Sequence, residues 1–170
     1  MHNSCSIITV LRRSMFYTDL LSMKQIANSV EKTAKIRVQT FGNFEVFAGE
    51  KPLIFSRSKT KELLAYLVSR QGALCNNNEI IAVIWDNRED SPSIKSMFRT
   101  LVADLTHTLN AAGAFGVLIK HRGHIGIAKD KVSCDLYDLL TGTNTNSYMG
   151  EYMTQYSWAE TTNNYLKSLF

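Results

Sequence analysis

The chain has 170 residues, 45% of them hydrophobic and 20% charged, and this size allows one or two small domains. No run approaches the roughly 18 apolar residues of a membrane-spanning helix, and the apolar stretch 7–11 is too short for an export signal. We therefore expect a cytoplasmic protein with no membrane partner. The net charge is +4, and residues 1–75 carry 11 Lys and Arg against 5 Asp and Glu, which suits a nucleic-acid partner without requiring one.

The first third of the chain predicts a helix followed by a small sheet. Apolar residues between Leu20 and Val30 recur near helical spacing, so residues 1–35 are expected to form an N-terminal helical extension. Apolar and polar residues then alternate, as they do in half-buried strands, and turn residues interrupt the pattern twice. The strands expected to pair as an antiparallel sheet are residues 36–41, 44–48 and 52–55.

Two shorter helices are predicted after the sheet. Ser56 or Ser58 is expected to cap the first helix, whose apolar residues recur on one face and which ends before Gly72. The second helix is expected to be capped within 76–78 and to end near Trp85. A polar loop follows at 86–91, with four charged residues among its six.

A long amphipathic helix is expected over about 92–112, because Ser91 can cap it and Pro92 suits a first helical turn. Its predicted core face is Ile94, Met97, Phe98, Leu101, Leu105 and Leu109. The opposite face, at about 100° per residue, is free to meet a partner. That face carries Ser96, Arg99, Thr100, Ala103, His107 and Asn110, with Lys95 on its flank.

A hairpin is predicted over 117–128, with strands at 117–120 and 125–128 around the basic tip His121-Arg122-Gly123-His124. The elements thus follow in the order helix, short connection, longer helix and cationic hairpin. A winged helix-turn-helix has this order, and it presents one helix to the major groove of DNA. The expected fold is therefore a mixed α/β (α+β) winged helix-turn-helix. The candidate DNA contacts are Arg57, Lys59, Lys61, Lys95, Ser96, Arg99, Thr100, Ala103, His107, Lys120, His121, Arg122 and His124.

Three stretches taken together resemble the OmpR-type winged helix of the antibiotic-regulatory-protein (SARP) class. They are Ile36-Arg-Val-Gln-Thr-Phe-Gly-Asn-Phe-Glu-Val-Phe, Lys59-Thr-Lys-Glu-Leu-Leu-Ala-Tyr-Leu-Val and Glu79-Ile-Ile-Ala-Val-Ile-Trp. The similarity continues at Cys134-Asp-Leu-Tyr, which looks like the start of a bacterial transcriptional activator domain. Tyr148-Met-Gly-Glu-Tyr-Met-Thr-Gln-Tyr-Ser-Trp-Ala resembles an early helix of that domain, which stacks tetratricopeptide-like helices. The resemblance implies a winged helix at 36–130 and a partial activator region at 131–170.

The resemblance also implies a function, namely a transcriptional regulator that binds promoter repeats in double-stranded DNA as a dimer or a tandem pair. In this class the loop between the second and third helices contacts RNA polymerase. The corresponding residues here are Asp86, Asn87, Arg88, Glu89 and Asp90. Related regulators often carry an N-terminal receiver domain. Residues 1–35 are too few to form one, and they contain a single aspartate, Asp19. We expect residues 131–170 to hold only the opening of the activator region.

Other readings of the sequence stay open beside this one. The main alternative is a protein–protein interaction module on the same fold, with weak or no DNA binding. No phosphate loop, GxSxG or HExxH motif occurs, so no enzyme activity and no cofactor are expected. Cys5, Cys75 and Cys134 are far apart, and His121 and His124 lack evident further ligands, so neither a disulfide nor a metal site is predicted.

Overall fold

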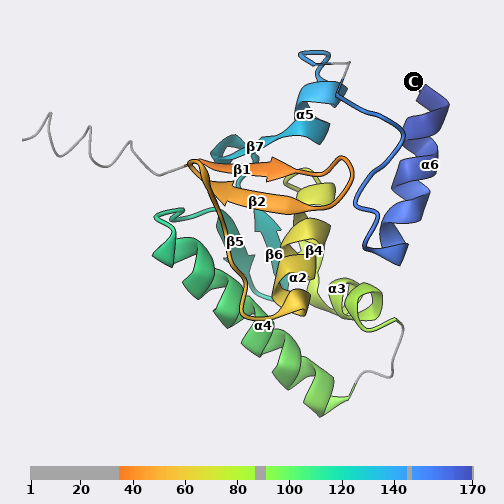
Figure 1. The fold of residues 1–170 in the computed structure, drawn as a ribbon. Coiled ribbons are helices and arrows are strands. Elements are labelled where there is room, and N and C mark those ends of the chain that lie inside the picture. The colour runs from red at the N-terminus through yellow and green to blue at the C-terminus, as the bar shows by residue number, and fades with distance from the viewer. Residues whose placement is uncertain (1–34, 87–90, 145–146, 170) are drawn as a thin grey trace, which may run out of the picture. The chain divides into compact units, whose positions relative to one another are not determined.

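The computed structural model describes residues 35–86, 91–144 and 147–169 (Figure 1). The chain divides into two units, Met1–Thr33 and Ala34–Phe170, and everything described below belongs to the second. The predicted N-terminal helix lies outside the described residues. Two small sheets and five α-helices make up the described part, as expected for a mixed α/β protein. No helix among these residues is long and apolar enough to cross a membrane.

The first sheet has the strand order β3-β2-β1-β7. Strands β1 (Ile36–Gln39) and β2 (Glu45–Ala48) pair antiparallel, and alternate residues of β1 are buried, as the sequence pattern predicted. The third strand was predicted too late in the chain, because β3 consists of Lys51–Pro52 alone. One further backbone bond follows it, from the N–H of Leu53 to the Val46 carbonyl at 2.7 Å. The fourth strand, β7 (Val132–Cys134), pairs parallel with β1 and was not predicted.

Helices α2 (Ser58–Ser69) and α3 (Asn77–Ile84) lie where the sequence placed them. The cap of α3 is confirmed, because the Asn76 side chain accepts a hydrogen bond from the backbone N–H of Asn78 at 2.8 Å. The expected serine cap of α2 is wrong. Arg57 occupies the N-cap position without a side-chain cap, and Ser58 is already helical.

Helix α4 (Pro92–Ala111) is the longest of the described helices, and Ser91 caps it through a 3.2 Å hydrogen bond from the N–H of Ile94. Four residues of its predicted core face are buried: Phe98, Leu101, Leu105 and Leu109. Met97 was wrongly assigned to that face, since it is 45% exposed. Its side chain lines a pocket that Trp85, at the end of α3, also lines.

The second sheet has the order β4-β6-β5 and contains the predicted hairpin. Strands β5 (Leu118–His121) and β6 (His124–Ile127) pair antiparallel, and β4 (Cys75–Asn76) adds to the outer side of β6. Each hairpin strand is shifted by one residue from its predicted range, so the turn is Arg122-Gly123 alone. Gly123 has a positive φ of 74°, which such a tight turn favours.

The C-terminal part contains the 3-10 helices η1 (Lys129–Lys131) and η2 (Ser157–Ala159) and the α-helices α5 (Asp135–Leu140) and α6 (Glu160–Leu169). The early helix expected at 148–159 is wrong for most of its length, because helical structure begins only at Ser157. Residues 151–154 instead lie along the β1–β2 turn, with backbone hydrogen bonds to residues 40 and 42 and an antiparallel bridge between Phe41 and Tyr152.

We define the C-terminal joint as residues 40–44 together with Asp135 and residues 151–155. The Asp135 carboxylate accepts hydrogen bonds from the backbone N–H groups of Thr40, Phe41 and Leu136 and from the Thr40 hydroxyl, at 2.6–3.0 Å. Gln155 accepts from the N–H of Phe44 and donates to its carbonyl. Thr40 is fully buried, so these bonds satisfy groups that water does not reach.

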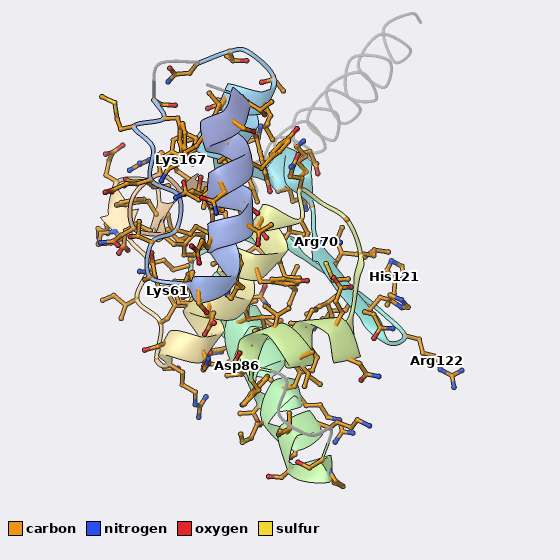
Figure 2. The ribbon with its side chains drawn as sticks, turned by 90° about the vertical axis from the view of Figure 1, so that its right-hand side faces the viewer. Lys61, Arg70, Asp86, His121, Arg122 and Lys167 are labelled. Carbon is orange, nitrogen blue, oxygen red and sulfur yellow. The ribbon has the colours of Figure 1, made fainter. Side chains whose placement is uncertain are left out.

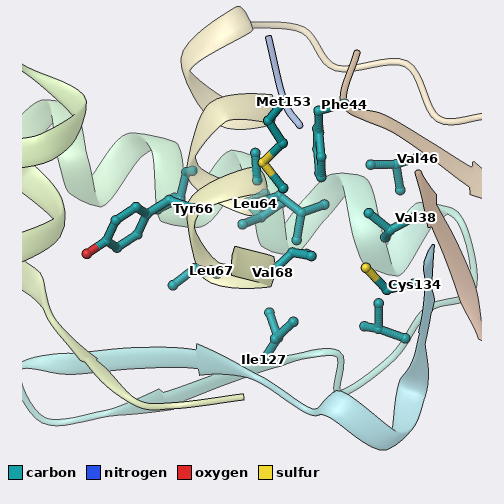
Figure 3. Packing of buried hydrophobic residues seen from close by; sticks show 14 of the residues in the cluster. Val38, Phe44, Val46, Leu64, Tyr66, Leu67, Val68, Ile127, Cys134 and Met153 are labelled. Atoms are coloured by element: carbon teal, nitrogen blue, oxygen red, sulfur yellow. The ribbon is translucent and has the colours of Figure 1, made fainter. Parts of the chain in front are cut away.

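The core joins residues from both ends of the described chain (Figure 3). Leu64 and Val68 of α2 face the inner residues Val38 and Val46 of the first sheet, and Met153 of the C-terminal joint packs beside Phe44. Met153 is fully buried although its φ of 43° is unusual for a side-chain-bearing residue. Burial of this side chain offsets the backbone strain, which fixes residues 151–155 against the sheet.

Candidate nucleic-acid interface

Helix α4 presents one continuous polar face to solvent, which we call the exposed α4 face. Ser96, Arg99, Thr100, Ala103 and His107 are all exposed, as the helical periodicity predicted. Lys95, on the flank, is half-buried and has an interaction of its own. The Thr100 hydroxyl bonds the Ser96 carbonyl at 3.1 Å, one turn back along the helix. The face offers one guanidinium, hydroxyls and an imidazole, all of which can donate hydrogen bonds.

Asp104 fastens α4 to the start of α2. Its carboxylate accepts hydrogen bonds from the hydroxyls of Thr60, at 2.6 Å, and Ser56, at 2.8 Å, and lies 3.6 Å from the Arg57 guanidinium. The hydrogen bond from Thr60, supported by Ser56, Arg57 and His107, holds the pKa of Asp104 below its usual range. The negative charge therefore sits beside the uncapped N-terminus of α2, where the helix dipole favours it.

The hairpin tip, defined as residues 121–124, is exposed throughout, and the residue before it contacts α4. Lys120 donates from Nζ to the Thr106 hydroxyl at 3.3 Å, which links β5 to α4. On the other side, the N–H of Asn77 donates to the Gly123 carbonyl at 3.0 Å, which links the tip to α3. Figure 2 shows His121 and Arg122 projecting from the tip away from the body of the protein.

Gly126 lets β6 approach the chain before β4 closely. A Cβ at this position would lie 2.9 Å from the carbonyl oxygen of Ala73 and 3.1 Å from the Leu74 side chain. Only a glycine fits without displacing the backbone, so the hairpin is held tightly against residues 73–76. The direction in which the tip projects is thereby fixed by packing rather than by the two-residue turn alone.

The three cations at the start of α2 already contact acceptors within the protein. Arg57 is paired with Asp104, and Lys61 with Glu45 of β2 at 2.8 Å. Lys59 lies 2.8 Å from Glu62 and donates to the carbonyl of Ile84 at 2.7 Å. The sequence grouped these residues with the DNA contacts, but it contained no sign of these partners, because each cation contacts at least one residue from another segment of the chain.

The predicted polymerase-contacting loop is described only at its ends. Asp86 is exposed and has a positive φ of 55°, and Ser91 caps α4. Asn87, Arg88, Glu89 and Asp90 lie outside the described residues. Near this loop, the described residues form a pocket of about 460 Å³ between α2, α4 and the end of α3. It is lined by Arg57, Ser58, Lys59, Trp85, Met97, Thr100 and Leu101.

Other reactive side chains are used structurally. Burial, chiefly, raises the pKa of the Cys134 thiol to about 12, and it also raises the pKa of Cys75, so both thiols stay protonated at neutral pH. Trp158 donates to Glu62 at 3.3 Å and stacks on Tyr156, so its ring packs within the fold. Within the ranges that the structure describes, no three His, Cys, Asp or Glu side chains gather as a metal site would require.

Sequence reasoning missed the roles of two polar residues, Asp104, which fastens α4 to the start of α2, and Asp135, which holds the C-terminal joint. Asp104 could have been suspected because it is the one acidic residue in the predicted long helix. Its partners Ser56 and Thr60 are more than 40 positions away, and nothing local identifies them. Comparison of the sequence with models of protein families gives no match, and a search of curated proteins gives none either.

Proposed function

We propose that the protein is a DNA-binding transcriptional regulator of the winged helix-turn-helix type, which uses α4 as its recognition helix and the β5–β6 hairpin as its wing. The observation that carries the proposal is the combination of an exposed α4 face with a cationic hairpin whose Lys120 contacts α4. Both are fastened to the body, the helix by Asp104 and the hairpin by the contacts of Lys120 and Gly123. A rigid, preformed surface of this kind loses little conformational entropy on binding.

The dimensions and chemistry of α4 suit the major groove. Its 20 residues make a rod about 30 Å long, and the groove is about 12 Å wide, enough to admit one helix. In this orientation Arg99 would donate two hydrogen bonds to a guanine or to a phosphate, while Ser96 and Thr100 donate to phosphates. The hairpin tip would carry Arg122 to the neighbouring phosphates or into the minor groove.

The proposal assigns the protein no catalytic step and no cofactor, and sets its action in the bacterial cytoplasm at promoter DNA. Pairing of two copies on repeated half-sites follows from the small footprint of one recognition helix. Contact between the loop at 86–91 and RNA polymerase rests on the family resemblance alone. The resemblance to the OmpR-type winged helix supports the whole proposal independently of the surface chemistry.

A protein–protein interaction module on the same fold is the second candidate. It is favoured by the internal pairing of Arg57, Lys59 and Lys61, which leaves fewer cations for phosphate. Exposed apolar side chains in the C-terminal part, such as Met149 and Tyr165, also suit a protein partner. In this alternative the N-terminal extension and the C-terminal helices would dock another regulator chain.

Selection from a pool of random DNA duplexes at two salt concentrations tests the proposal. The full chain is incubated with the pool, and the bound duplexes are sequenced. We expect a repeated motif to be enriched, and affinity for it to fall steeply as salt rises, because phosphate contacts release counterions. Absence of both enrichment and salt-sensitive binding would reject DNA binding and leave the interaction module as the better candidate.

A further inference from the structure

The pocket between α2, α4 and the end of α3 has the size and the lining of a small-molecule site. Its volume of about 460 Å³ falls within the range of roughly 300 to 1,000 Å³ that such sites occupy. We propose that this cavity, which we call the α2–α4 pocket, binds a small aromatic carboxylate. The ring system would lie against its apolar walls, and the carboxylate would lie at its cationic rim.

Apolar side chains from two helices form the walls. Trp85, at the end of α3, and Leu101, of α4, are buried core residues that also line the pocket. Met97, one turn before Leu101, lines it too and is 45% exposed, so a ligand would remove apolar surface from water. An indole favours contact with another aromatic ring, and the unbranched thioether of methionine adapts to the shape of its neighbour. The walls therefore suit a flat apolar group.

The rim of the pocket is cationic. Arg57 and Lys59 line it, and no acidic residue does so in the part of the chain that the structure describes. Both cations are ion-paired, but their side chains are 54% and 49% exposed, whereas those of their partners Asp104 and Glu62 are 16% and 13% exposed. The positive ends of the two pairs are thus the more accessible ones, and an incoming anion meets them first.

Arg57 has the donors that a carboxylate requires. Its guanidinium lies 3.6 Å from Asp104, which is close enough for an ion pair but too far for a good hydrogen bond. A planar guanidinium can bind a second carboxylate through two parallel N–H bonds. Lys59 donates to Glu62 and to the carbonyl of Ile84, which leaves one of its N–H groups for the ligand. We therefore assign the main anion contact to Arg57.

A small molecule fits this pocket better than a partner protein does. A stable protein interface takes about 20 to 30 residues from each side. Seven described residues line the pocket, and they surround a concave volume in which most of a small ligand would be buried. A neutral apolar ligand would use the walls alone, whereas an aromatic carboxylate uses both the walls and the rim.

Ligand binding would also affect DNA binding, a consequence that rests on the proposed function. Arg57, Lys59 and Thr100 line the pocket and are candidate DNA contacts as well. A carboxylate held by Arg57 would take the place of a phosphate there. If the two ligands exclude each other, the aromatic acid at about ten times its dissociation constant lowers the apparent DNA affinity about 10-fold.

Isothermal titration calorimetry of the full chain with 2-naphthoate, in the absence of DNA, tests the site. We expect one ligand per chain, with a dissociation constant on the order of 0.1 mM for a molecule of this size. The matched neutral ligand, 2-naphthalenemethanol, has the same rings and no charge. It should bind at least about fivefold more weakly, because it forms no charge-assisted hydrogen bond with Arg57.

Two variants alter the pocket at exposed positions, where substitution should leave the fold intact. Met97→Glu places a carboxylate among the walls, and Arg57→Gln removes the cation assigned to the ligand. Each should weaken binding of 2-naphthoate about 10-fold or more. Met149→Glu and Lys51→Gln make the same changes of charge at exposed positions outside the pocket and should bind like the wild type. Thermal melting of all five chains checks their folding.

The outcomes separate this inference from the proposed function. Absence of binding at millimolar 2-naphthoate, equal binding by the pocket variants and their controls, or equal binding of the acid and the alcohol would each overturn the ligand site. Competition is measured separately, by the anisotropy of a labelled duplex with and without 2-naphthoate. A duplex affinity that the ligand does not change overturns the competition alone, and a chain that binds no DNA overturns the proposed function while the calorimetry still decides the ligand site.

Discussion

The C-terminal joint and the exposed α4 face are parts of one compact unit, but their polar side chains differ in what they contact. In the joint, Asp135 and Gln155 are bonded to backbone groups of residues 40–44. On the α4 face, Arg99 and His107 point to solvent. Polar groups that are bonded within the fold stabilise it, so their removal lowers the free energy of unfolding. Polar groups that point to solvent are available to a partner. Substitutions in the two regions should therefore change different properties.

The largest effect is expected from Asp135→Ala. This substitution removes the acceptor for Thr40, which is fully buried, and for the N–H of Phe41. Four donors, counting the N–H of Leu136, then lose this acceptor, and we expect the free energy of unfolding to fall by about 3 to 4 kcal/mol. Urea denaturation followed by circular dichroism measures it. Asp130→Asn, at an exposed position, is the control and should stay within about 0.5 kcal/mol of the wild type.

Met153→Ala has the next largest expected effect on stability, and it tests packing instead of hydrogen bonding in the C-terminal joint. Met153 is fully buried in the core, so truncation leaves a cavity and should cost about 2 to 4 kcal/mol. Met149→Ala is a matched control four residues earlier, since Met149 is 87% exposed. Equal effects of the two substitutions on the urea midpoint would show that residues 151–155 are not packed as described.

These two regions also differ in how far the sequence predicted them. Local patterns sufficed for α2, α3 and α4, because their apolar residues repeat at helical spacing and Asn76 and Ser91 are typical caps. The same periodicity identified the exposed α4 face, since a residue opposite a buried stripe must point outward. The hairpin was predicted from its turn residues, to within one position at each end.

The C-terminal joint was not predicted, for a physical reason. Strand β7 has three residues, too few for a recognisable alternation, and it is stabilised by pairing with β1, almost 100 positions away. The stretch 148–156 has the spacing of a helix, but Tyr152 and Met153 gain more from burial against the sheet than a helix would give them. Tertiary contacts therefore override local preference in this region.

Arg99→Ala tests the exposed α4 face, the second of the two regions compared above. It should weaken binding to the selected duplex by about 1 to 3 kcal/mol, because Arg99 is the only arginine of the exposed α4 face and would contact a base or a phosphate. The urea midpoint should not move. Lys167→Ala in α6 removes the same charge elsewhere and serves as control. If both variants bind alike, the exposed α4 face is not the surface that reads DNA.

Asp104→Asn has the smallest expected effect and removes a polar contact on the buried side of α4, since Asp104 holds α4 against the start of α2. The folded-state pKa of Asp104 is lowered, so its ionised form stabilises the protein above the ordinary carboxyl pKa, and this contribution is lost as the pH falls through the lower folded value. We expect the substitution to cost about 1 kcal/mol at pH 7 and progressively less below about pH 4. Urea denaturation of both chains at pH 7 and pH 3 measures the difference.

In a double-mutant cycle with Thr60→Val the two losses should be less than additive, because both substitutions break the same 2.6 Å hydrogen bond. A cost independent of pH, or strictly additive losses, would mean that the carboxylate is not what fastens α4 to the body of the protein.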